Sequence, residues 1–209
     1  TLSIPAGKQA QIEQQATVEQ PRLWEPLPAK HPQLYVAVHT LIVGGEVQDV
    51  YETRFGIRSV EFSPSQGLLV NGNPVRIQGV NQHHDLGALG AAFNRRAAER
   101  QLEVLRDMGC NAIRMAHNPP APELLDLTDE MGFLVIDEIF DVWERKKTPL
   151  DFHLIFPEWY EQDLRSWIRR DRNHPSVIAW SYGNEVGEQY TDETGAELSQ
   201  RLSNIVNEE

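Results

Sequence analysis

From about residue 67 onward, this 209-residue chain repeats one pattern four times, and the repetition limits its possible folds more than any other feature. Each repeat is a short apolar run followed by a stretch with apolar residues every three or four positions. The apolar runs are 74–81, 111–118, 133–140 and 176–185, and the helical stretches are 95–109, 121–132, 157–173 and 194–208. Strands that alternate with helices form a parallel sheet with helical crossovers.

The region before these repeats has a different pattern. Residues 9–19, 33–43, 46–56 and 57–62 alternate with a period of two and are separated by proline and glycine, which indicates four or five antiparallel strands. An immunoglobulin-like sandwich has about seven strands. We therefore predict part of an immunoglobulin-like β-sandwich over residues 1–62, with its other strands either missing or outside this sequence.

Two α/β architectures fit the repeats, a doubly wound sheet and half of a (β/α)8 barrel. A nucleotide-binding doubly wound sheet needs a glycine-rich phosphate loop after its first strand, and "GVNQHHDLGALGAAF" (79–93) does not contain GxGxxG. We therefore predict the N-terminal half of a TIM-barrel domain over residues 63–209. In such barrels, the active site lies at the C-terminal ends of the strands.

Polar side chains gather where the four predicted strands end. They are Asn81, Gln82, His83, His84 and Asp85, then Arg114, His117 and Asn118, then Asp137, Glu138 and Asp141, and finally Asn184 and Glu185. A purely structural sheet does not need polar residues at one end only. A structural interpretation stays open for three of them, since Arg114 and Asp137 can form an ion pair between adjacent strands and His84 can be a solvated loop residue.

Composition narrows the class of ligand. The net charge of −12 makes nucleic acid and anionic membranes poor partners, and the chain has no apolar run long enough to span a membrane. Because Cys110 is the single cysteine of the chain, no disulfide can form within it, and we interpret Cys110 as a structural thiol. The absence of HExxH and CxxC spacing argues against zinc, and Ser181 has no GxSxG context.

We therefore expect no required cofactor, although Mg²⁺ or Ca²⁺ held by Asp137, Glu138 or Asp141 stays an alternative. General acid/base chemistry by Glu185 fits the pattern better. At the end of a buried strand, beside Trp180 and Tyr182, desolvation can keep a glutamate protonated near neutral pH. Such an acid can protonate a glycosidic oxygen, and the neighbouring amide of Asn184 can orient a sugar hydroxyl.

Three motifs resemble glycoside hydrolase family 2, the family of bacterial β-galactosidases and β-glucuronidases. They are "GVNQHHD" (79–85), "NAIRMAHNPPAPELLDLTDEMGFLVIDE" (111–138) and "RRDRNHPSVIAWSYGNE" (169–185). The resemblance implies a retaining β-glycosidase, most simply a β-galactosidase. It implies that Glu185 is the general acid/base, that Asn184 contacts the 2-hydroxyl and that His83 and His117 contact the glycone. Arg114 and Asp137 are implied as supporting residues at the site floor, and Asn81 as part of the same site.

The resemblance also places the nucleophilic glutamate on the seventh strand of the barrel, beyond Glu209. Retaining hydrolysis needs two carboxyl groups about 5–5.5 Å apart, so a sugar-binding or structural fragment without turnover stays an alternative, as does specificity for β-glucuronides or β-mannosides. An open half barrel exposes two strand edges and its inner face. We therefore expect a homo-oligomer, for example two halves closing one barrel by two-fold symmetry. The cellular compartment stays open, with bacterial cytoplasm or periplasm the simplest expectations.

Overall fold

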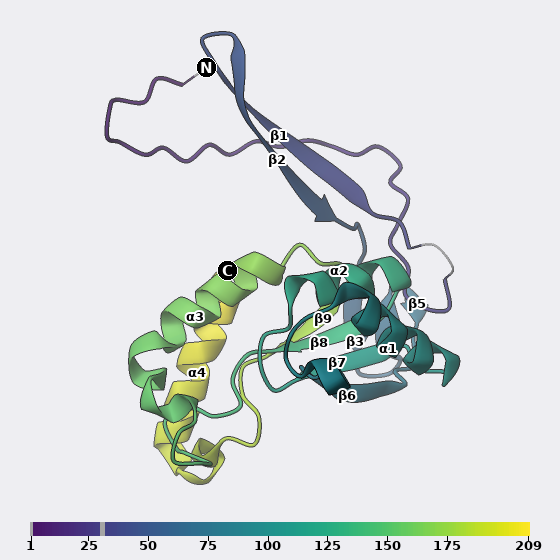
Figure 1. Cartoon of the computed structure of the whole chain (residues 1–209), viewed down its shortest axis with the longest axis vertical. Helices are drawn as coiled ribbons and strands as arrows, with labels where there is room; N and C mark the ends of the chain where they lie inside the picture. Colours follow the sequence, from purple (N-terminus) through teal and green to yellow (C-terminus); the bar gives the residue numbers. More distant parts are fainter. Residues whose placement is uncertain (1, 30–31) are drawn as a thin grey trace.

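The computed structural model describes residues 2–29 and 32–209, and its centre is a four-stranded parallel sheet with its strands in chain order (Figure 1). The strands are β6 (Gly79–His83), β7 (Ala112–Ala116), β8 (Leu134–Glu138) and β9 (Val177–Ser181). The helices that follow them are α1 (Arg95–Asp107), α2 (Pro122–Met131), α3 (Phe156–Asp171) and α4 (Asp192–Glu208), with short 3-10 turns η1 (Gly87–Leu89), η2 (Phe152–Leu154) and η3 (Gly187–Tyr190). The four predicted βα units of a half barrel are confirmed.

Local sequence signals set the ends of the first two helices. The Asn94 side chain caps α1 by accepting a hydrogen bond of 3.0 Å from the backbone N–H of Ala97. Pro122 is the first residue of α2, where its missing N–H costs nothing. The same helix ends at Gly132, whose φ of +79° is left-handed and suits glycine.

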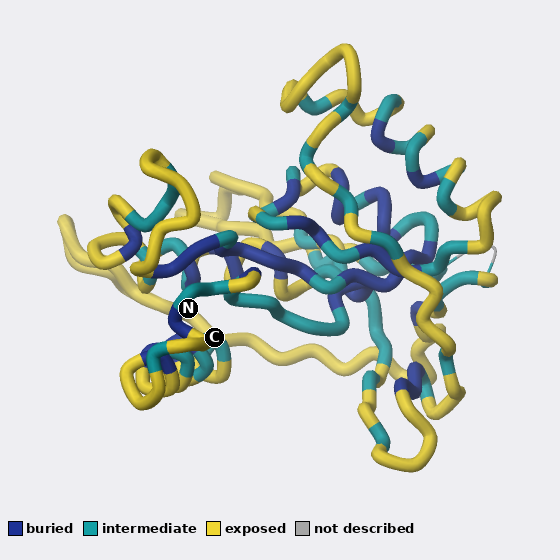
Figure 2. The backbone as a smooth tube through the Cα atoms, turned by 90° about the horizontal axis from the view of Figure 1, so that it is seen from below, coloured by how far each residue is buried: buried dark blue, intermediate teal, exposed yellow. Residues whose placement is uncertain are grey.

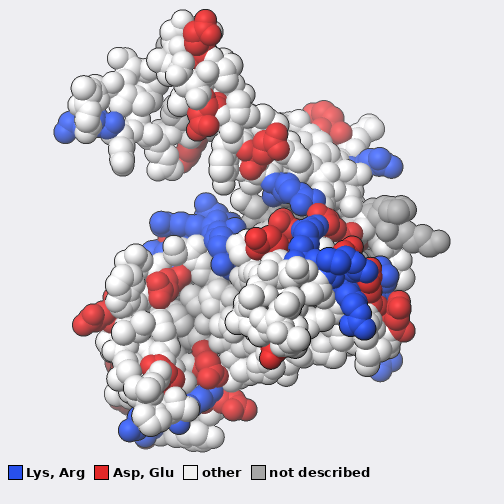
Figure 3. Space-filling model, viewed as in Figure 1, with Lys and Arg blue, Asp and Glu red and all other residues white. Residues whose placement is uncertain are grey.

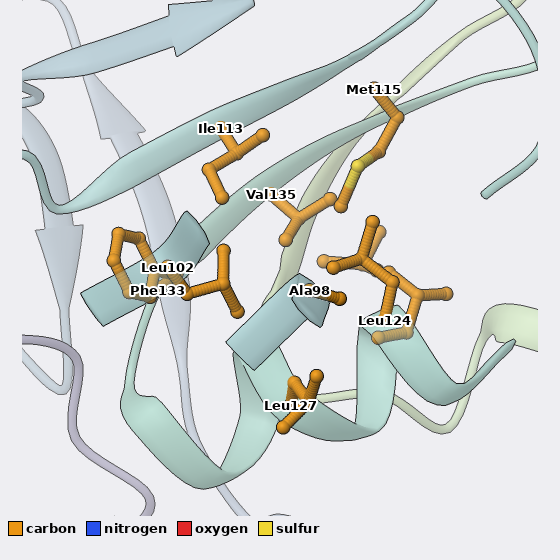
Figure 4. Close-up of a cluster of buried hydrophobic side chains, with 10 residues drawn as sticks. Ala98, Leu102, Ile113, Met115, Leu124, Leu127, Phe133 and Val135 are labelled. Atoms are coloured by element: carbon orange, nitrogen blue, oxygen red, sulfur yellow. The ribbon is translucent and has the colours of Figure 1, made fainter. Parts of the chain in front are cut away.

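Helices α1 and α2 cover one face of the sheet. Ile113 of β7 and Val135 of β8 meet Leu102 of α1 and Leu124 of α2 in one buried cluster (Figure 4). Full burial of an aliphatic side chain of this size stabilises the fold by about 1.5–3 kcal/mol. The two central strands, β7 and β8, are the most buried part of this sheet (Figure 2), which explains why their sequences are nearly continuous apolar runs. The edge strand β6 alternates between exposed and half-buried residues.

The other two helices form a second layer. Helices α3 and α4 lie side by side (Figure 1), and Leu164 and Ile168 of α3 share a buried cluster with Leu198 and Leu202 of α4. This cluster continues to the residues that follow β8 and β9, among them Phe140. It therefore supports the two loops that carry Asp141, Asn184 and Glu185.

A small antiparallel sheet covers the N-terminal ends of the parallel strands. It consists of β3 (Val60–Ser63), β4 (Gly67–Val70) and β5 (Asn73–Pro74). Trp24 is fully buried beneath it and contacts Leu68 and Leu134, while its indole N–H donates to the Asp129 carbonyl at 2.9 Å. This contact joins the N-terminal region to the barrel domain.

The predicted sandwich portion contributes one hairpin, β1 (Tyr35–Val43) and β2 (Glu46–Phe55), which projects from the body (Figure 1). Its turn, Gly44–Gly45, has two positive φ angles of 63° and 91°, as two-residue hairpin turns require. The predicted strands at 33–43 and 46–56 are thus confirmed.

The other two predicted strands of this region differ from the structure. Residues 9–19 are exposed and form no strand, because no described segment lies beside them to complete a ladder. The segment 57–62 contributes to β3, which pairs with β4 rather than with the hairpin. The predicted boundary between a sandwich portion (1–62) and a barrel portion (63–209) falls inside β3 and stays a prediction. Residues 1, 30 and 31 of the predicted sandwich portion lie outside the part of the chain that the structure describes.

The surface carries charges of both signs next to one another (Figure 3). Glu130 of α2, for example, pairs with Arg54 at 2.9 Å and with Arg95 at 2.6 Å. Exposed pairs of this kind contribute about 0–1 kcal/mol each. No helix among residues 2–29 and 32–209 is long and apolar enough to cross a membrane.

Candidate active site

The polar strand-end residues converge on one buried carboxylate, Glu138, at the end of β8. Its Oε2 atom accepts from Arg114 Nε at 2.9 Å, from Arg114 Nη2 at 2.7 Å and from Ser181 Oγ at 2.5 Å. Its Oε1 atom lies 2.6 Å from His117 Nδ1. A fully buried charge is tolerated only when it is paired and hydrogen-bonded, and Glu138 meets both conditions.

Asn184 is held by several contacts beside this carboxylate. Its Oδ1 accepts from Arg114 Nη2 at 2.9 Å, and its Nδ2 donates to Asp141 Oδ1 at 2.8 Å. Lys147 Nζ donates to the Asn184 carbonyl at 2.7 Å and to Asp141 Oδ1 at 2.8 Å. Partial burial opposes ionisation of Asp141, but the Asn184 amide and Lys147 outweigh it and lower the Asp141 pKa. The side chain of Asn184 is therefore fixed in one orientation.

The predicted glycone contacts lie along the same edge. The ring of His83 packs edge-on against His117 with centroids 5.3 Å apart, and Asn81 is in register with Arg114 on the neighbouring strand. Because Nδ1 of His117 is occupied by Glu138, its Nε2 atom is left to face a ligand. His84 is a loop residue whose Nε2 lies 3.0 Å from the Ala91 carbonyl.

Glu185 occupies a different environment from the one predicted. It is exposed rather than desolvated, and its φ of 44° lies in the left-handed region. The reason is that β9 ends at Ser181, so Glu185 is a loop residue beyond the edge of the sheet. The aromatic side chains of Trp180 and Tyr182 pack instead on Trp167 and Trp143.

Asp137 also lies elsewhere than predicted. The structural alternative of an ion pair between Arg114 and Asp137 is wrong, because Arg114 pairs with Glu138. Adjacent residues of a strand face opposite sides, so the Asp137 carboxyl is buried on the helix side, toward Trp167 and Asp171 of α3. Burial, and secondly the charge of Asp171, raise the pKa of Asp137 to about 8. Trp167 and Asp171 lie close enough to affect its ionisation, but no described polar group meets hydrogen-bond geometry with either carboxyl oxygen.

The carboxylates considered for Mg²⁺ or Ca²⁺ do not form a cluster. Asp137 faces α3, Glu138 is occupied by Arg114 and His117, and Asp141 pairs with Lys147 at 2.8 Å. Within residues 2–29 and 32–209, no group of three or more His, Cys, Asp or Glu side chains is arranged to hold a metal ion. The residues instead suit hydrogen bonding to a polar organic ligand.

Comparison with known families agrees with this geometry. Residues 63–204 match the family model "Glycosyl hydrolases family 2, TIM barrel domain", and residues 2–58 match "Glycosyl hydrolases family 2". The chain belongs to glycosyl hydrolase family 2. The half barrel and the immunoglobulin-like portion before it are therefore parts of this family's architecture.

Relatives of this chain within family 2 include proteins named beta-galactosidase and proteins named beta-glucuronidase. Beta-galactosidase BoGH2A of Bacteroides ovatus is 51% identical over 201 residues, which are 96% of this chain and 23% of the relative. A beta-glucuronidase of Streptococcus agalactiae is 36% identical, covering 78% of this chain and 28% of the relative. The chain thus spans about a quarter of the length of these relatives.

Solved structures give the same result. A glycosyl hydrolase family 2 member from Bacteroides cellulosilyticus superposes with a TM-score of 0.84 at 39% identity, covering 90% of this chain and 24% of that chain. A β-glucuronidase from Ruminococcus gnavus in complex with C6-substituted uronic isofagomine has a TM-score of 0.76 at 32% identity, covering 89% of this chain and 31% of that chain. The fold shared with family 2 therefore extends over nearly the whole chain.

Several residues of the network were not assigned a site role from the sequence. The sequence pattern indicates Glu138 only as a strand-end carboxylate and possible metal ligand, and it gives no indication of Lys147. For Glu138 a signal existed, because two adjacent acids on one strand cannot both face the same side. Lys147 lies in the long β8–α3 connection, where spacing carries no information on which loop it touches.

Proposed function

We propose that this chain provides the acid/base part of a retaining β-glycosidase, with Glu185 as the general acid/base. The observation that carries the proposal is the immobilised Asn184 at the C-terminal edge of the sheet, with the exposed Glu185 directly after it. An exposed acid beside a rigid amide can reach a ligand, whereas the buried and fully paired Glu138 cannot. Glu138 is therefore assigned as a positioning residue.

The proposed chemistry has two proton transfers. Glu185 donates its proton to the glycosidic oxygen as the bond to the anomeric carbon breaks, and a second carboxylate attacks that carbon. Glu185 then removes a proton from the water that releases the sugar from this carboxylate. Each step leaves Glu185 in the form that the next step needs.

The polar groups of the network have capacity left for a sugar. Asn184 uses one lone pair of Oδ1 toward Arg114 and one N–H toward Asp141, so one acceptor and one donor site are still free. These can bind the hydroxyl next to the reacting carbon. His117, held by Glu138, presents Nε2 to another hydroxyl, and His83 and Asn81 extend the same edge.

The second carboxylate is proposed to come from outside these 209 residues. The inner face of the sheet bears an apolar groove of about 270 Å³ lined by side chains such as Leu134, Ile136 and Ile178. Four further βα units would cover this face and close the barrel, supplied by the same polypeptide or by a second copy. Light scattering on the 209-residue chain tests the second source: a dimer is expected if two copies close one barrel, and a monomer would exclude it.

We propose β-galactosides as the substrate class, since the relative with 51% identity is named a beta-galactosidase. β-Glucuronides are the second candidate, because relatives at 36% identity carry that name. Hydrolysis of a panel of nitrophenyl β-glycosides by the intact natural protein distinguishes them. Sugar binding without hydrolysis of any member would favour the alternative of a silent carbohydrate-binding protein.

Replacement of Glu185 tests the assignment of the acid. Glu185→Gln removes the transferable proton and is expected to lower turnover of the preferred nitrophenyl glycoside by about 10²–10⁴-fold. Glu197→Gln, an equivalent change at an exposed site of α4, is the matched control and should keep parental activity. Equal activities of the two variants would overturn the role of Glu185.

A further inference from the structure

Glu185 lies in a short segment whose backbone conformation is unusual. Its φ of 44° is left-handed, a conformation that residues with a side chain seldom adopt. Such a conformation persists only where the surrounding structure holds it in place. We call residues 182–188, which lead from β9 into η3, the acid loop. The contacts of the acid loop therefore show what holds Glu185.

A second segment, residues 143–147 of the connection between β8 and α3, is joined to the acid loop at alternate residues. Both segments leave the sheet toward α3 and α4 (Figure 1). Trp143 Nε1 donates to the Tyr182 carbonyl at 2.6 Å, and Arg145 Nη1 donates to the Gly187 carbonyl at 3.2 Å. We call residues 143–147 the strap. Its two outer bonds reach the acid loop on both sides of the acid.

Lys147 of the strap makes the contact nearest to Glu185 along the chain. Its Nζ donates to the Asn184 carbonyl at 2.7 Å and to Asp141 Oδ1 at 2.8 Å. The Asn184 carbonyl and the Glu185 N–H belong to the same peptide group, which is planar. A bond that holds this oxygen therefore also holds the N–H, which is one end of the φ rotation of Glu185.

Glu188 fixes the distance between the strap and the far end of the acid loop. Its Oε1 accepts from the backbone N–H of Arg145 at 2.6 Å, and its side chain is buried. Water does not compete for a hydrogen bond in such a place, and the low local dielectric strengthens it. The acid loop is thus held before, at and after Glu185.

Glycine occupies the two places where the acid loop comes closest to the strap. A Cβ at Gly183 would lie 2.9 Å from Trp143 Nε1, and a Cβ at Gly187 would lie 3.0 Å from Arg145 Cβ. Contacts this short would push the two segments apart. The glycines two residues before and two residues after Glu185 therefore allow the strap to lie directly against the loop.

The strap is itself anchored at its C-terminal end by Asp151. The Oδ2 atom of Asp151 accepts from the backbone N–H groups of Lys147 at 2.8 Å and Thr148 at 2.6 Å, and Oδ1 accepts from the N–H of His153 at 3.1 Å. The Lys147 ammonium therefore reaches the acid loop from a fixed backbone.

We infer that the strap holds the Glu185 carboxyl in place for proton transfer, with Lys147 as its main positioning residue. This inference rests on the proposed function, because it assigns a task only if Glu185 is the acid. An acid must lie about 2.6–3.2 Å from the atom that it protonates, and a misplacement of about 1 Å can lower the rate about 10²-fold. Lys147 acts on this distance through the peptide group between Asn184 and Glu185.

The test compares methyl and dinitrophenyl β-glycosides of the preferred sugar. A methyl glycoside needs a proton on its leaving oxygen and a dinitrophenyl glycoside does not, whereas both make the same contacts with the glycone site. In the intact natural protein, Lys147→Met is expected to lower the ratio of kcat/KM for the methyl glycoside to that for the dinitrophenyl glycoside about tenfold, the effect of losing a hydrogen bond from a charged group. A merely structural role would lower both values equally and leave the ratio unchanged.

The matched control is Lys146→Met, at the preceding residue. Among residues 2–29 and 32–209, no group forms a hydrogen bond or an ion pair with the Lys146 ammonium, whereas Lys147 has both. Lys146→Met removes the same charge from the strap and should keep the parental ratio.

Two further variants show whether the effect passes through Glu185. In a Glu185→Gln background, Lys147→Met should leave the ratio unchanged, because no proton remains to be positioned. Trp143→Phe removes the bond to Tyr182 but keeps an aromatic ring, and it should lower the ratio about two- to tenfold, the effect of losing a neutral hydrogen bond. This milder variant decides the inference if Lys147→Met does not fold.

The outcomes separate the strap from the proposed function. An unchanged ratio in folded Lys147→Met, or in Trp143→Phe where Lys147→Met does not fold, overturns the strap and leaves Glu185 as the acid. A further fall of the ratio in the Glu185→Gln background also overturns it, because Lys147 would then act on the leaving group by another route. If Glu185→Gln itself shows no dependence on the leaving group, the proposed function fails, and the inference fails with it.

Discussion

Asp137 and Glu138 are neighbours on β8, both are 0% exposed, and their surroundings are opposite. Glu138 faces the inner side of the sheet, where Arg114, His117 and Ser181 contact its two oxygens. Asp137 faces α3, where no described group meets hydrogen-bond geometry with it. One residue of displacement along a strand therefore separates a paired carboxylate from an unpaired one.

The cost of burying a carboxylate is avoided in a different way on each face of β8. On the inner face, a cation compensates the charge, so the carboxylate can organise Arg114, His117 and, through Arg114, Asn184. On the helix face the raised pKa, about 8, means that Asp137 is protonated at neutral pH and buries no net charge. Only the inner face can serve as an electrostatic anchor for the candidate site.

The largest expected effect comes from removing the charge of Glu138. Glu138→Gln leaves Arg114 without its buried counterion, and loss of one partner of a buried ion pair destabilises by about 3–5 kcal/mol. Denaturant unfolding of the intact natural protein measures this loss. The matched control is Glu130→Gln, which breaks surface pairs with Arg54 and Arg95 and is expected to cost about 0–1 kcal/mol. Similar costs for the two variants would show that the network is not an anchor.

A smaller effect with a distinct pH dependence is expected at Asp137. Its pKa is raised from 3.8 to about 8 on folding, so the native state holds a proton that the unfolded chain has released. The stability that this proton contributes is present below pH 4 and is lost as the pH rises toward 8. Asp137→Asn removes this dependence. Relative to the parent, the variant should therefore gain about 2 kcal/mol between pH 5 and about pH 6.5, because the loss in the parent is about 1.4 kcal/mol for each pH unit.

The control for this experiment is Asp107→Asn, because the Asp107 side chain is 78% exposed. Its stability difference from the parent should be the same at both pH values. If Asp137→Asn gives an equally flat difference, the Asp137 carboxyl is ionised in the native state, and the contrast between the two faces of β8 disappears.

Much of the architecture was predictable because the spacing of apolar residues along the sequence indicates strands and helices directly. The four βα units follow from apolar runs that alternate with helical spacing, and Gly132 ends a helix where the pattern stops. The gathering of polar groups at one edge follows from parallel topology, since C-terminal strand ends meet there. The convergence of Arg114, His117 and Asn184 agrees with that expectation.

The orientation of individual carboxylates was not predictable. The segment "FLVIDEIF" (133–140) is apolar on both faces, so no alternation shows which of Asp137 and Glu138 points inward. A shift in register between Val135 and Ile136 further changes which β9 residues they meet. The exposure of Glu185 depends on where β9 stops, and strand ends are the least certain feature of a sequence pattern.

The central claim is that Glu185, which directly follows the immobilised Asn184, protonates the leaving group. The most direct test is the dependence of Glu185→Gln activity on the leaving group, measured as kcat/KM for a dinitrophenyl and a methyl β-glycoside of the preferred sugar. A dinitrophenolate departs without a proton, whereas methoxide does not, so the variant should lose at least about 10²-fold more activity on the methyl glycoside. Equal losses on the two substrates would contradict the assignment of Glu185 as the acid.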